Sequence, residues 1–261
     1  MYLSTRSFHF ELSTEYMIVH FLNKFPSILL RFKDIIVLAP IRMKRFLKHL
    51  FKLTSANEKW NEISTTRLRF LALSEYLAKG MIYFLAIFGI AELYETISDF
   101  LKFNTRPLAD WEINLAKTVF NDTIDYSKVR VDNYAFIGPK QYRFAYVGFN
   151  TMNAWGPMSN SLFLHEMTHI YQYQKLGAIY IYDALKAQHS EKGYNYGGAE
   201  ELKQMLVDGK KFSDFNLEQQ GDIVSDYFLI KSGYQPRWGN GGKVDLETYE
   251  KCLSEINGDV V

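Results

Sequence analysis

Cysteine is nearly absent from this sequence: Cys252 is the only one among 261 residues. A single thiol excludes an internal disulfide framework and cannot form a thiolate-rich zinc site. The fold must therefore rest on an apolar core. With 48% hydrophobic and 16% aromatic residues the chain has ample material for one, and this composition argues against disorder.

Long apolar runs are also lacking. The longest, GMIYFLAIFGIA at residues 80–91, lies between Lys79 and Glu92 and is shorter than the roughly 20 residues that a membrane-spanning helix needs. We therefore expect a buried helix or helical hairpin there. The first 16 residues show no charged segment followed by an apolar one, so no ordinary signal peptide is visible. The expectation is a protein that is cytoplasmic as made, with export left to a specialised secretion system.

Charge is concentrated near the amino terminus. Residues 1–60 carry ten Lys/Arg against four Asp/Glu, and residues 31–52 hold seven of these basic residues beside one acid. Apolar positions such as Met43 and Leu47 alternate with them, which indicates a basic amphipathic helix. Such a helix suits a peripheral membrane contact or the acidic surface of a secretion apparatus; the alternative is a helix packed on its own domain with a solvated basic face. No nucleic-acid-binding module accompanies the charge, so no nucleic acid is expected as a partner.

Two regions can be distinguished along the chain. Residues 1–105 are predicted to be mostly helical, with breaks at Pro26 and Pro40. The stretch FNTRPLAD around Pro107 interrupts the helical pattern and is the expected boundary. Residues 106–261 mix both periodicities, so the fold class is α+β: a small sheet packed on an active-site helix, preceded by the helical region.

The second region has a readable order of elements. Alternating β-branched and aromatic residues predict strands, a turn is expected at Gly138-Pro139, and a long connection should follow the helix that contains residues 161–176. Asn216 is a good N-cap and Gly233 a natural end for a later helix. The expected elements are a helix at 111–120, strands at 128–131 and 142–149, and helices at 161–176, 199–206, 216–233 and 246–256.

The stretch SLFLHEMTHIYQYQKLG contains the motif H-E-x-x-H. On a helix, His165 and His169 lie one turn apart on the same face and can direct their imidazoles at a common centre. Glu166 lies near the same centre. Two histidines in this pattern hold a zinc ion, and the glutamate acts on a zinc-bound water. The alternative is a pair of histidines that are solvated or satisfied within the core.

A catalytic zinc site normally takes three protein ligands. The candidates for the third are His189, the pair Glu200–Glu201, and Glu218. The metzincin motif H-E-x-x-H-x-x-G-x-x-H is excluded, because Gln172 and Lys175 stand where it needs Gly and His.

The string EQQGD favours Glu218 among these candidates. Glu218 and Asp222 are one helical turn apart, so Glu218 can bind zinc while Asp222 accepts the Nδ1–H of a ligating histidine, His165 by preference. Gly221 lacks a side chain and would let this helix approach the first one closely. The alternatives remain that Glu218 only complements the helix dipole, or that no third protein ligand exists.

HEMTH with EQQGD resembles the gluzincin branch of zincin metallopeptidases. The stretches VFNDTIDYSKVRV, LHEMTHIYQYQ, GYNYG and FNLEQQGDIVSDYF also look like zincin domains that bacteria encode beside Vgr-type spike proteins of type VI secretion. The resemblance covers about residues 111–232. It implies Zn²⁺ held by His165, His169 and Glu218, with Glu166 as general base and Asp222 behind a ligand. The family's Asn directly before the ligand glutamate is displaced here to position 216.

The function expected from these features is zinc-dependent hydrolysis of a peptide or protein substrate. Glu166 would take a proton from the water and hand it to the leaving amine. The oxyanion needs a second donor, for which Tyr196, Tyr194 and His189 lie between the two motifs. Two alternatives stay open: a binding or secretion-associated adaptor without turnover, and a hydrolase of non-peptide substrates.

Overall fold

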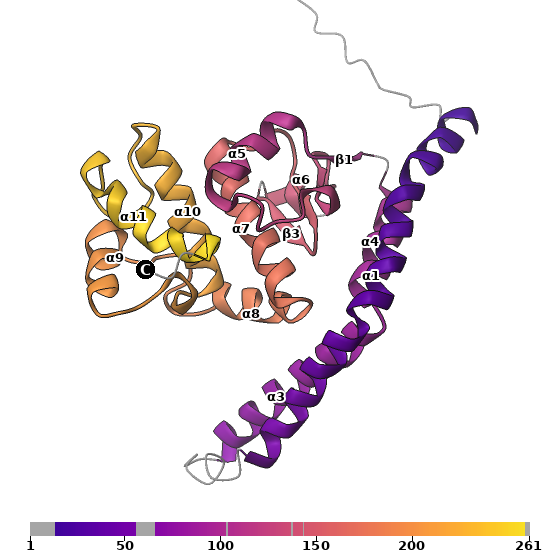
Figure 1. Ribbon diagram of the computed structural model, residues 1–261, viewed down its shortest axis with the longest axis horizontal. Helices are drawn as coiled ribbons and strands as arrows, with labels where there is room; N and C mark the ends of the chain where they lie inside the picture. The colour runs from indigo at the N-terminus through magenta and orange to yellow at the C-terminus, as the bar shows by residue number, and fades with distance from the viewer. Residues whose placement is uncertain (1–13, 56–65, 103, 137, 143, 259–261) are drawn as a thin grey trace, which may run out of the picture.

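A long helical hairpin forms one side of the molecule in the computed structural model, which describes residues 14–55, 66–102, 104–136, 138–142 and 144–258. Helix α1 (Thr14–Ser55) runs along the whole hairpin, and α3 (Thr66–Ile87) and α4 (Ile90–Leu101) run back beside it (Figure 1). The prediction that the chain has no ordinary signal peptide concerns its first 16 residues, and residues 1–13 of these lie outside the described part.

The predicted helix breaks at Pro26 and Pro40 are wrong. Both prolines lie inside the single 42-residue helix α1. An interior proline removes one hydrogen bond and crowds the carbonyl four residues earlier, which weakens a helix but does not have to end it. Here ion pairs and packing with α3 and α4 stabilise α1 on both sides of each proline.

The apolar run at 80–91 is helical as predicted, with a turn at Phe88–Gly89 between α3 and α4. Gly89 has φ +70°, and a Cβ there would lie 2.4 Å from Cγ1 of Ile35, so the turn requires glycine. The predicted burial is wrong: α3 contains no buried residue. By length and composition alone, α3 is apolar enough to cross a membrane, with a mean hydropathy of 1.4.

Charged residues occupy the inside of the hairpin. Glu95 and Asp99 of α4 are buried against Arg31 of α1, whose Nη2 lies 2.6 Å from Oδ2 of Asp99 and whose Nε lies 3.4 Å from Oε2 of Glu95. Burial raises the pKa of Glu95 to about 7, although Arg31 opposes the shift. We call the whole set of paired residues the polar seam: Lys24, Arg31 and Arg42 of α1 with Glu92, Glu95 and Asp99 of α4.

The basic residues that were predicted to share one face at 31–52 therefore divide into buried or paired arginines and exposed lysines. Arg31 and Arg42 belong to the polar seam, and Nη1 of Arg45 donates to the carbonyl of Leu176 at 2.8 Å. These arginines hold the hairpin together and tie it to the rest of the protein. The lysines of the segment remain on the surface.

The sheet has four strands of three residues each. They are β1 (Thr105–Pro107), β2 (Arg130–Asp132), β3 (Tyr146–Gly148) and β4 (Thr151–Asn153), in the order β1-β2-β4-β3. Strands β2 and β4 are parallel, and the two outer pairs are antiparallel. The class is thus α+β, as expected. The predicted strand at 128–131 overlaps β2, and the one at 142–149 contains β3, whereas β1 and β4 were missed because three residues are too few to show an alternation. Residues Pro139–Tyr142 form the short helix α6, where a turn at Gly138-Pro139 and the start of a strand at Tyr142 were expected.

Helices supply most of the remaining body. The predicted helices are confirmed, but α8 was missed inside the expected long connection. The helices are α5 (Asp110–Phe120), α7 (Asn160–Leu176), α8 (Ile179–Gln188), α9 (Gly198–Val207), α10 (Leu217–Lys231) and α11 (Leu246–Leu253). The core lies between the sheet, α7 and α10, where Met152, Met167, Ile170 and Ile223 are fully buried together.

The division at residues 105 and 106 stays a prediction. Strand β1 begins at Thr105, so the sheet starts one residue before that boundary. Polar contacts join the two regions: Lys128 pairs with Asp34 of α1 at 2.7 Å, and Glu95 accepts the backbone N–H of Asn150 at 2.6 Å. The hairpin is therefore joined to the body by polar contacts and does not merely precede it.

Candidate metal centre

Helix α7 carries the H-E-x-x-H motif and is well capped. The Ser159 side chain accepts the N–H of Leu162 at 3.3 Å, and Gly177 ends the helix with φ +78°. Within α7, His165 and His169 lie one turn apart and face α10, and both are buried.

Helix α10 begins with a reciprocal cap. The Asn216 side chain accepts the N–H of Gln219 at 2.9 Å, and the Gln219 side chain accepts the N–H of Asn216 at 3.1 Å. This fixes the first turn of α10, which carries Glu218, and places Asp222 one turn later. Asn216 thus serves as the N-cap of α10, as predicted.

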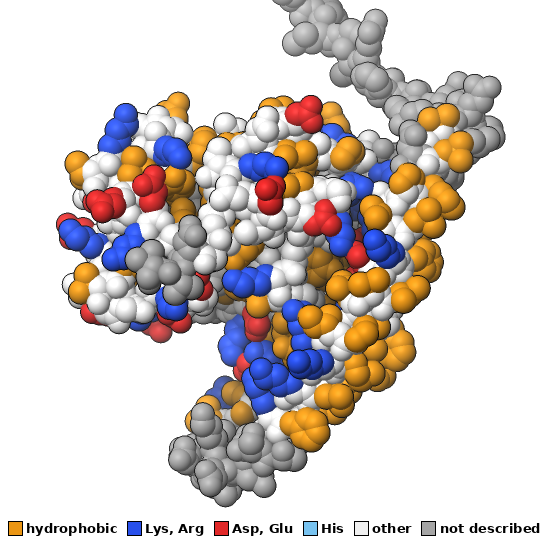
Figure 2. Space-filling view, viewed as in Figure 1, with side chains coloured by type: hydrophobic (Ala, Val, Ile, Leu, Met, Phe, Trp, Pro, Cys, Tyr) orange, Lys and Arg blue, Asp and Glu red, His pale blue; other side chains and the backbone are white. Residues whose placement is uncertain are grey.

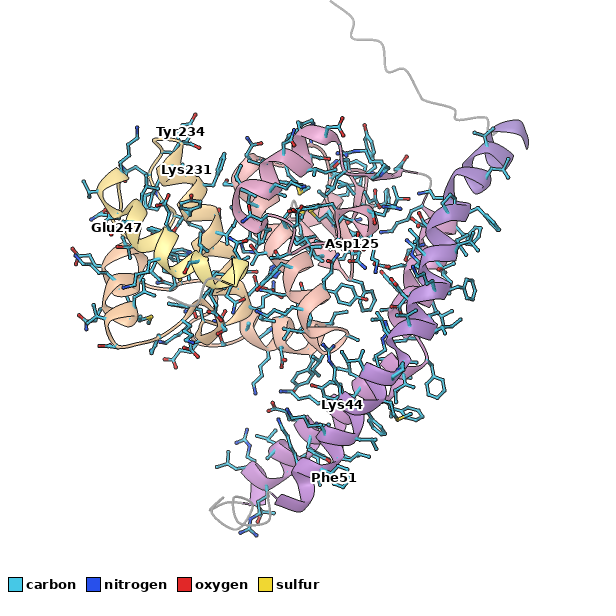
Figure 3. All side chains as sticks on the ribbon, in the orientation of Figure 1. Lys44, Phe51, Asp125, Lys231, Tyr234 and Glu247 are labelled. Carbon is cyan, nitrogen blue, oxygen red and sulfur yellow. The ribbon has the colours of Figure 1, made fainter. Side chains whose placement is uncertain are left out.

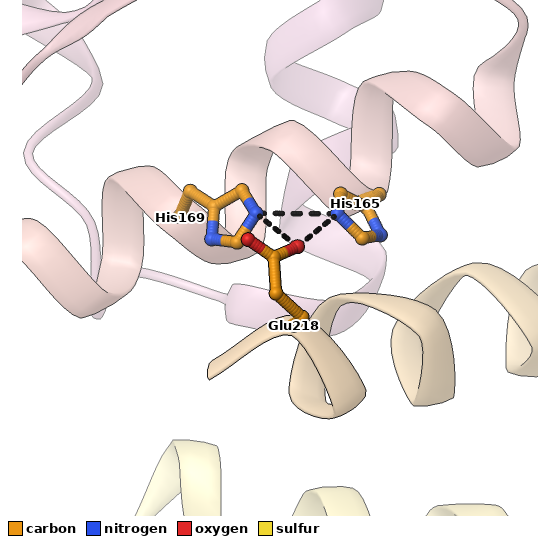
Figure 4. A group of neighbouring side chains, drawn as sticks. All are labelled: His165, His169 and Glu218. Carbon is orange, nitrogen blue, oxygen red and sulfur yellow. Dashed lines mark hydrogen bonds and ion pairs between the residues drawn. The ribbon is translucent and has the colours of Figure 1, made fainter. Parts of the chain in front are cut away.

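Three side chains converge between the two helices (Figure 4). The Nε2 atoms of His165 and His169 lie 3.2 Å apart. Oε2 of Glu218 lies 3.5 Å from Nε2 of His165 and 3.4 Å from Nε2 of His169. These three buried residues form the one group of potential metal ligands found in the described part of the chain.

Each histidine is held at its other ring nitrogen. Oδ1 of Asp222 lies 2.8 Å from Nδ1 of His165, the position predicted for it. Oε1 of Gln172 lies 2.8 Å from Nδ1 of His169, and Gln172 also donates to Oε1 of Gln220 at 2.9 Å. Both acceptors orient an imidazole so that Nε2 faces the shared centre. The role of Gln172 was not foreseen, although its place three residues after His169 on one helix face is a usable signal.

A second layer surrounds Asp222. Its Oδ2 accepts the indole N–H of Trp238 and lies 3.3 Å from Nη1 of Arg237. The guanidinium of Arg237 also lies 5.5 Å from the centre of the Tyr194 ring. These contacts hold the carboxylate that orients His165.

Gly221 permits the close approach of the two helices, as predicted. A Cβ at this position would lie 2.6 Å from Cε1 of His165 and 2.7 Å from its Nδ1. No side chain fits there without moving the imidazole.

Gly221→Ala should therefore displace His165 and lower the zinc affinity of the purified protein by at least the roughly 10- to 100-fold expected when the support of a ligand is lost. Competition with a chromogenic chelator measures this affinity. Gly242→Ala is the matched control, because a Cβ there meets nothing within 4 Å. Equal affinity in the Gly221 variant and the control would show that His165 is not a ligand.

The charges at the centre suit a cation. Burial lowers the pKa of His165, but hydrogen bonds to Asp222 and Glu218 outweigh it and raise the pKa to about 10. For Glu218, burial raises the pKa, whereas contacts with His165 and His169 bring it down to about 2. Two imidazole nitrogens and one carboxylate oxygen that converge in this way could hold a metal cation.

Glu166 differs from the other acids of the centre. It is buried, and its Oε2 has no hydrogen-bond partner among the described residues. Burial raises its pKa, although both histidines oppose the shift. A buried carboxylate oxygen without a partner is costly, and a ligand, a bound water or a catalytic role would account for it.

A cleft of about 600 Å³ opens onto the centre. His165, Glu166, His169 and Glu218 form its polar floor, and strand β3 lines one wall. In the described part of the chain β3 pairs only with β4, so its other edge is free. The remaining wall is mainly apolar: Tyr94, Phe144, Phe149, Ile181 and Leu185. The contributions of α4 and α8 were not predicted, because no local pattern relates them to the motif.

The three candidate oxyanion donors lie in different places. Tyr194 lines the cleft, and its ring stacks beside His165 with 6.0 Å between the ring centres. The prediction that Tyr196 is an oxyanion donor is wrong. Tyr196 is buried in the core, where its hydroxyl lies 2.6 Å from both Oδ2 of Asp226 and the hydroxyl of Tyr249.

The prediction that His189 is an oxyanion donor is also wrong, because His189 does not line the cleft. It is exposed at the end of α8, where its Nδ1 lies 2.8 Å from the Leu185 carbonyl oxygen. Among the other candidates for the third ligand, Glu200 and Glu201 are exposed on α9, outside the cluster.

Comparison with known proteins gives one relevant similarity. The chain is 36% identical over 141 residues to the type VI secretion system spike protein VgrG2b of Pseudomonas aeruginosa. The alignment covers 49% of this chain and 13% of that protein, so the chain spans a small part of its relative's length. No protein-family model matches the chain. No solved structure matches it either.

Proposed function

We propose that this protein is a zinc-dependent peptidase. The observation that supports the proposal most strongly is the convergence of His165, His169 and Glu218 beside an unpartnered Glu166 on the floor of a cleft. In this proposal α7 and α10 are the two motif helices of a gluzincin-like zincin domain.

The residues of the centre fit Zn²⁺. Nε2 of His165, Nε2 of His169 and Oε2 of Glu218 would hold the ion, while Asp222 and Gln172 keep both imidazoles in the tautomer that leaves Nε2 free. A zinc ion bound there would act as a Lewis acid on the substrate carbonyl and increase the acidity of the attacking water.

Glu166 is the general base of the proposed reaction. Its free oxygen at the cleft floor can accept a proton from the attacking water and later deliver it to the leaving amine. Burial raises the pKa of Glu166, which makes its carboxylate a stronger proton acceptor than an ordinary one. Tyr194, whose ring lines the cleft beside His165, would donate to the oxyanion.

The shape of the cleft favours a peptide among possible substrates. Strand β3 lines the cleft and has no second partner strand in the described part of the chain, and an extended chain can pair with such an edge. The apolar wall formed by Phe144, Phe149 and Leu185 would then receive a large apolar side chain near the scissile bond.

Type VI secretion is the proposed biological setting. The relative in Pseudomonas aeruginosa is by name a spike protein of that system. We infer that this chain is made in the cytoplasm and associates with such an apparatus for export, and that its peptidase activity acts on a protein substrate after delivery.

Glu218→Ala tests the ligand assignment. Removing the carboxylate should lower zinc affinity by more than the roughly 10- to 100-fold that Asp222→Ala produces through the support of His165. Glu201→Ala is the control, because that glutamate is exposed on α9. Zinc content after gel filtration measures all three. If Glu201→Ala loses the metal and Glu218→Ala retains it, the proposed site is wrong.

A further inference from the structure

The outer face of α1 is apolar and exposed. Large apolar side chains recur at intervals of three and four residues along it, so they form one stripe parallel to the helix axis. Ile36 is 74% exposed and Leu22 66% exposed. Figure 2 shows the stripe as a continuous apolar band along the edge of the molecule. We call it the apolar stripe: Leu22, Phe25, Leu29, Phe32, Ile36 and Leu47.

The hairpin as a whole reverses the usual placement of charged and apolar residues in a soluble pair of helices. Its charged residues meet inside in the polar seam, and its large apolar residues lie outside. On α3, Phe70 is 70% exposed and Met81 58% exposed. Exposed apolar surface on this scale marks a contact with another apolar phase.

A row of lysines borders the apolar stripe. Lys33 follows Phe32, and Lys48 follows Leu47, so each lies roughly 100° around the helix from the stripe. Lys44, which is labelled in Figure 3, continues the row between them. All three lysines are exposed, and none has a carboxylate within ion-pair distance among the described residues.

The charge of the hairpin disfavours a second copy of this chain as the partner that covers the apolar stripe. Every carboxylate whose side chain is described on α1, α3 and α4 already pairs within the chain: Asp34, Glu75, Glu92, Glu95 and Asp99. Two hairpins in contact would bring lysines together without counter-charges. The occupant must be apolar and negatively charged at its edge, which describes the surface of an anionic lipid bilayer.

The hairpin does not stand free of the body as a membrane span in this arrangement. Lys79 of α3 lies 3.2 Å from Asp183 of α8, and Glu75 of α3 lies 2.8 Å from Lys186 of the same helix. These ion pairs hold α3 against the body. We propose that the hairpin docks the protein flat on an anionic membrane, with the apolar stripe in the interface and Lys33, Lys44 and Lys48 at the headgroup phosphates.

Vesicle flotation of the full chain tests this proposal. The protein should float with vesicles of phosphatidylcholine containing about a third phosphatidylglycerol, bind pure phosphatidylcholine much more weakly, and dissociate from the anionic vesicles at high salt. Changing Lys33, Lys44 and Lys48 to Glu should weaken binding to anionic vesicles by at least about 100-fold. The control changes Lys203, Lys210 and Lys243, which are exposed on the body, to Glu. This control alters the net charge equally and should bind nearly as the parent does.

The apolar contribution is tested separately. Phe32→Ser with Ile36→Ser should reduce binding to anionic vesicles by at least about 10-fold, since two large side chains leave the interface. Circular dichroism shows that each variant is folded. The His165→Ala variant should bind vesicles as the parent does, so that failure of the metal site and failure of docking are distinguishable. Absence of vesicle binding, equal binding to neutral and anionic vesicles, or equal loss in the control would overturn the proposal. So would a dimer that Phe32→Ser dissociates in the absence of lipid binding.

Discussion

Glu166→Gln should reduce hydrolysis of a cleavable peptide by at least about 10²–10⁴-fold while zinc content stays at the level of the parent protein. The amide keeps the size and hydrogen-bonding shape of the carboxyl group but cannot accept the proton of the attacking water. Oε2 of Glu166 makes no hydrogen bond within the described structure, so the substitution breaks no contact there. Turnover of a peptide library by the purified chain, with zinc analysis of the same samples, measures both quantities.

Glu112→Gln is an informative companion variant. Glu112 is also a buried glutamate, but its carboxylate is held by Arg106 and by the N–H of Ala109. Its loss should reduce stability and leave the turnover of the folded fraction unchanged. If Glu166→Gln loses its zinc, Glu166 has a structural or ligating role. If it keeps both zinc and full biological activity, the protein acts as a binding module, and hydrolysis is not its function.

His165→Ala combined with His169→Ala should abolish zinc binding, from about one ion per chain to almost none. The two imidazoles supply two of the three converging donor atoms, and Glu218 alone cannot hold the ion. Metal analysis after dialysis against a weak chelator gives the occupancy. His49→Ala with His189→Ala is the control, because both of those residues lie outside the centre.

The double variant also leaves Glu218 buried without both histidines and Asp222 without His165, which destabilises the fold. Circular dichroism must therefore accompany the metal analysis. The single variant His169→Asn keeps His165 between the two acids and should still lose most of the zinc. Full occupancy in either folded variant would contradict the proposed ligand set.

The sequence was sufficient to predict that these side chains converge, because they lie at helical spacing. His165, Glu166 and His169 belong to one turn of α7, and Glu218 with Asp222 belongs to one turn of α10. Both helices have local caps, and Gly221 signals their close approach. The fold class followed from the same periodicities, and the helices of the body other than α6 and α8 were predicted for this reason.

The features that were missed depend on contacts between distant residues. Tyr94 reaches the cleft only because α4 lies beside the body, and Tyr196 is drawn into the core by Asp226 and Tyr249. The strands β1 and β4 are too short to show a period of their own.

The burial of residues 80–91 was mispredicted for a different reason. Apolar residues normally point inward, but here α3 packs mainly against the single helix α1, which leaves its apolar side chains uncovered. No local pattern shows which face of α1 will meet α4.

The central claim, a zinc ion held by two histidines and one glutamate, is tested most directly by zinc X-ray absorption spectroscopy of the purified chain. The account predicts about one zinc per chain with only nitrogen and oxygen neighbours at about 2.0–2.2 Å, including the scattering pattern of two imidazoles that disappears in the His165 and His169 double variant. A sulfur neighbour at about 2.3 Å, which Cys252 alone could supply, or zinc without imidazole scattering would contradict it.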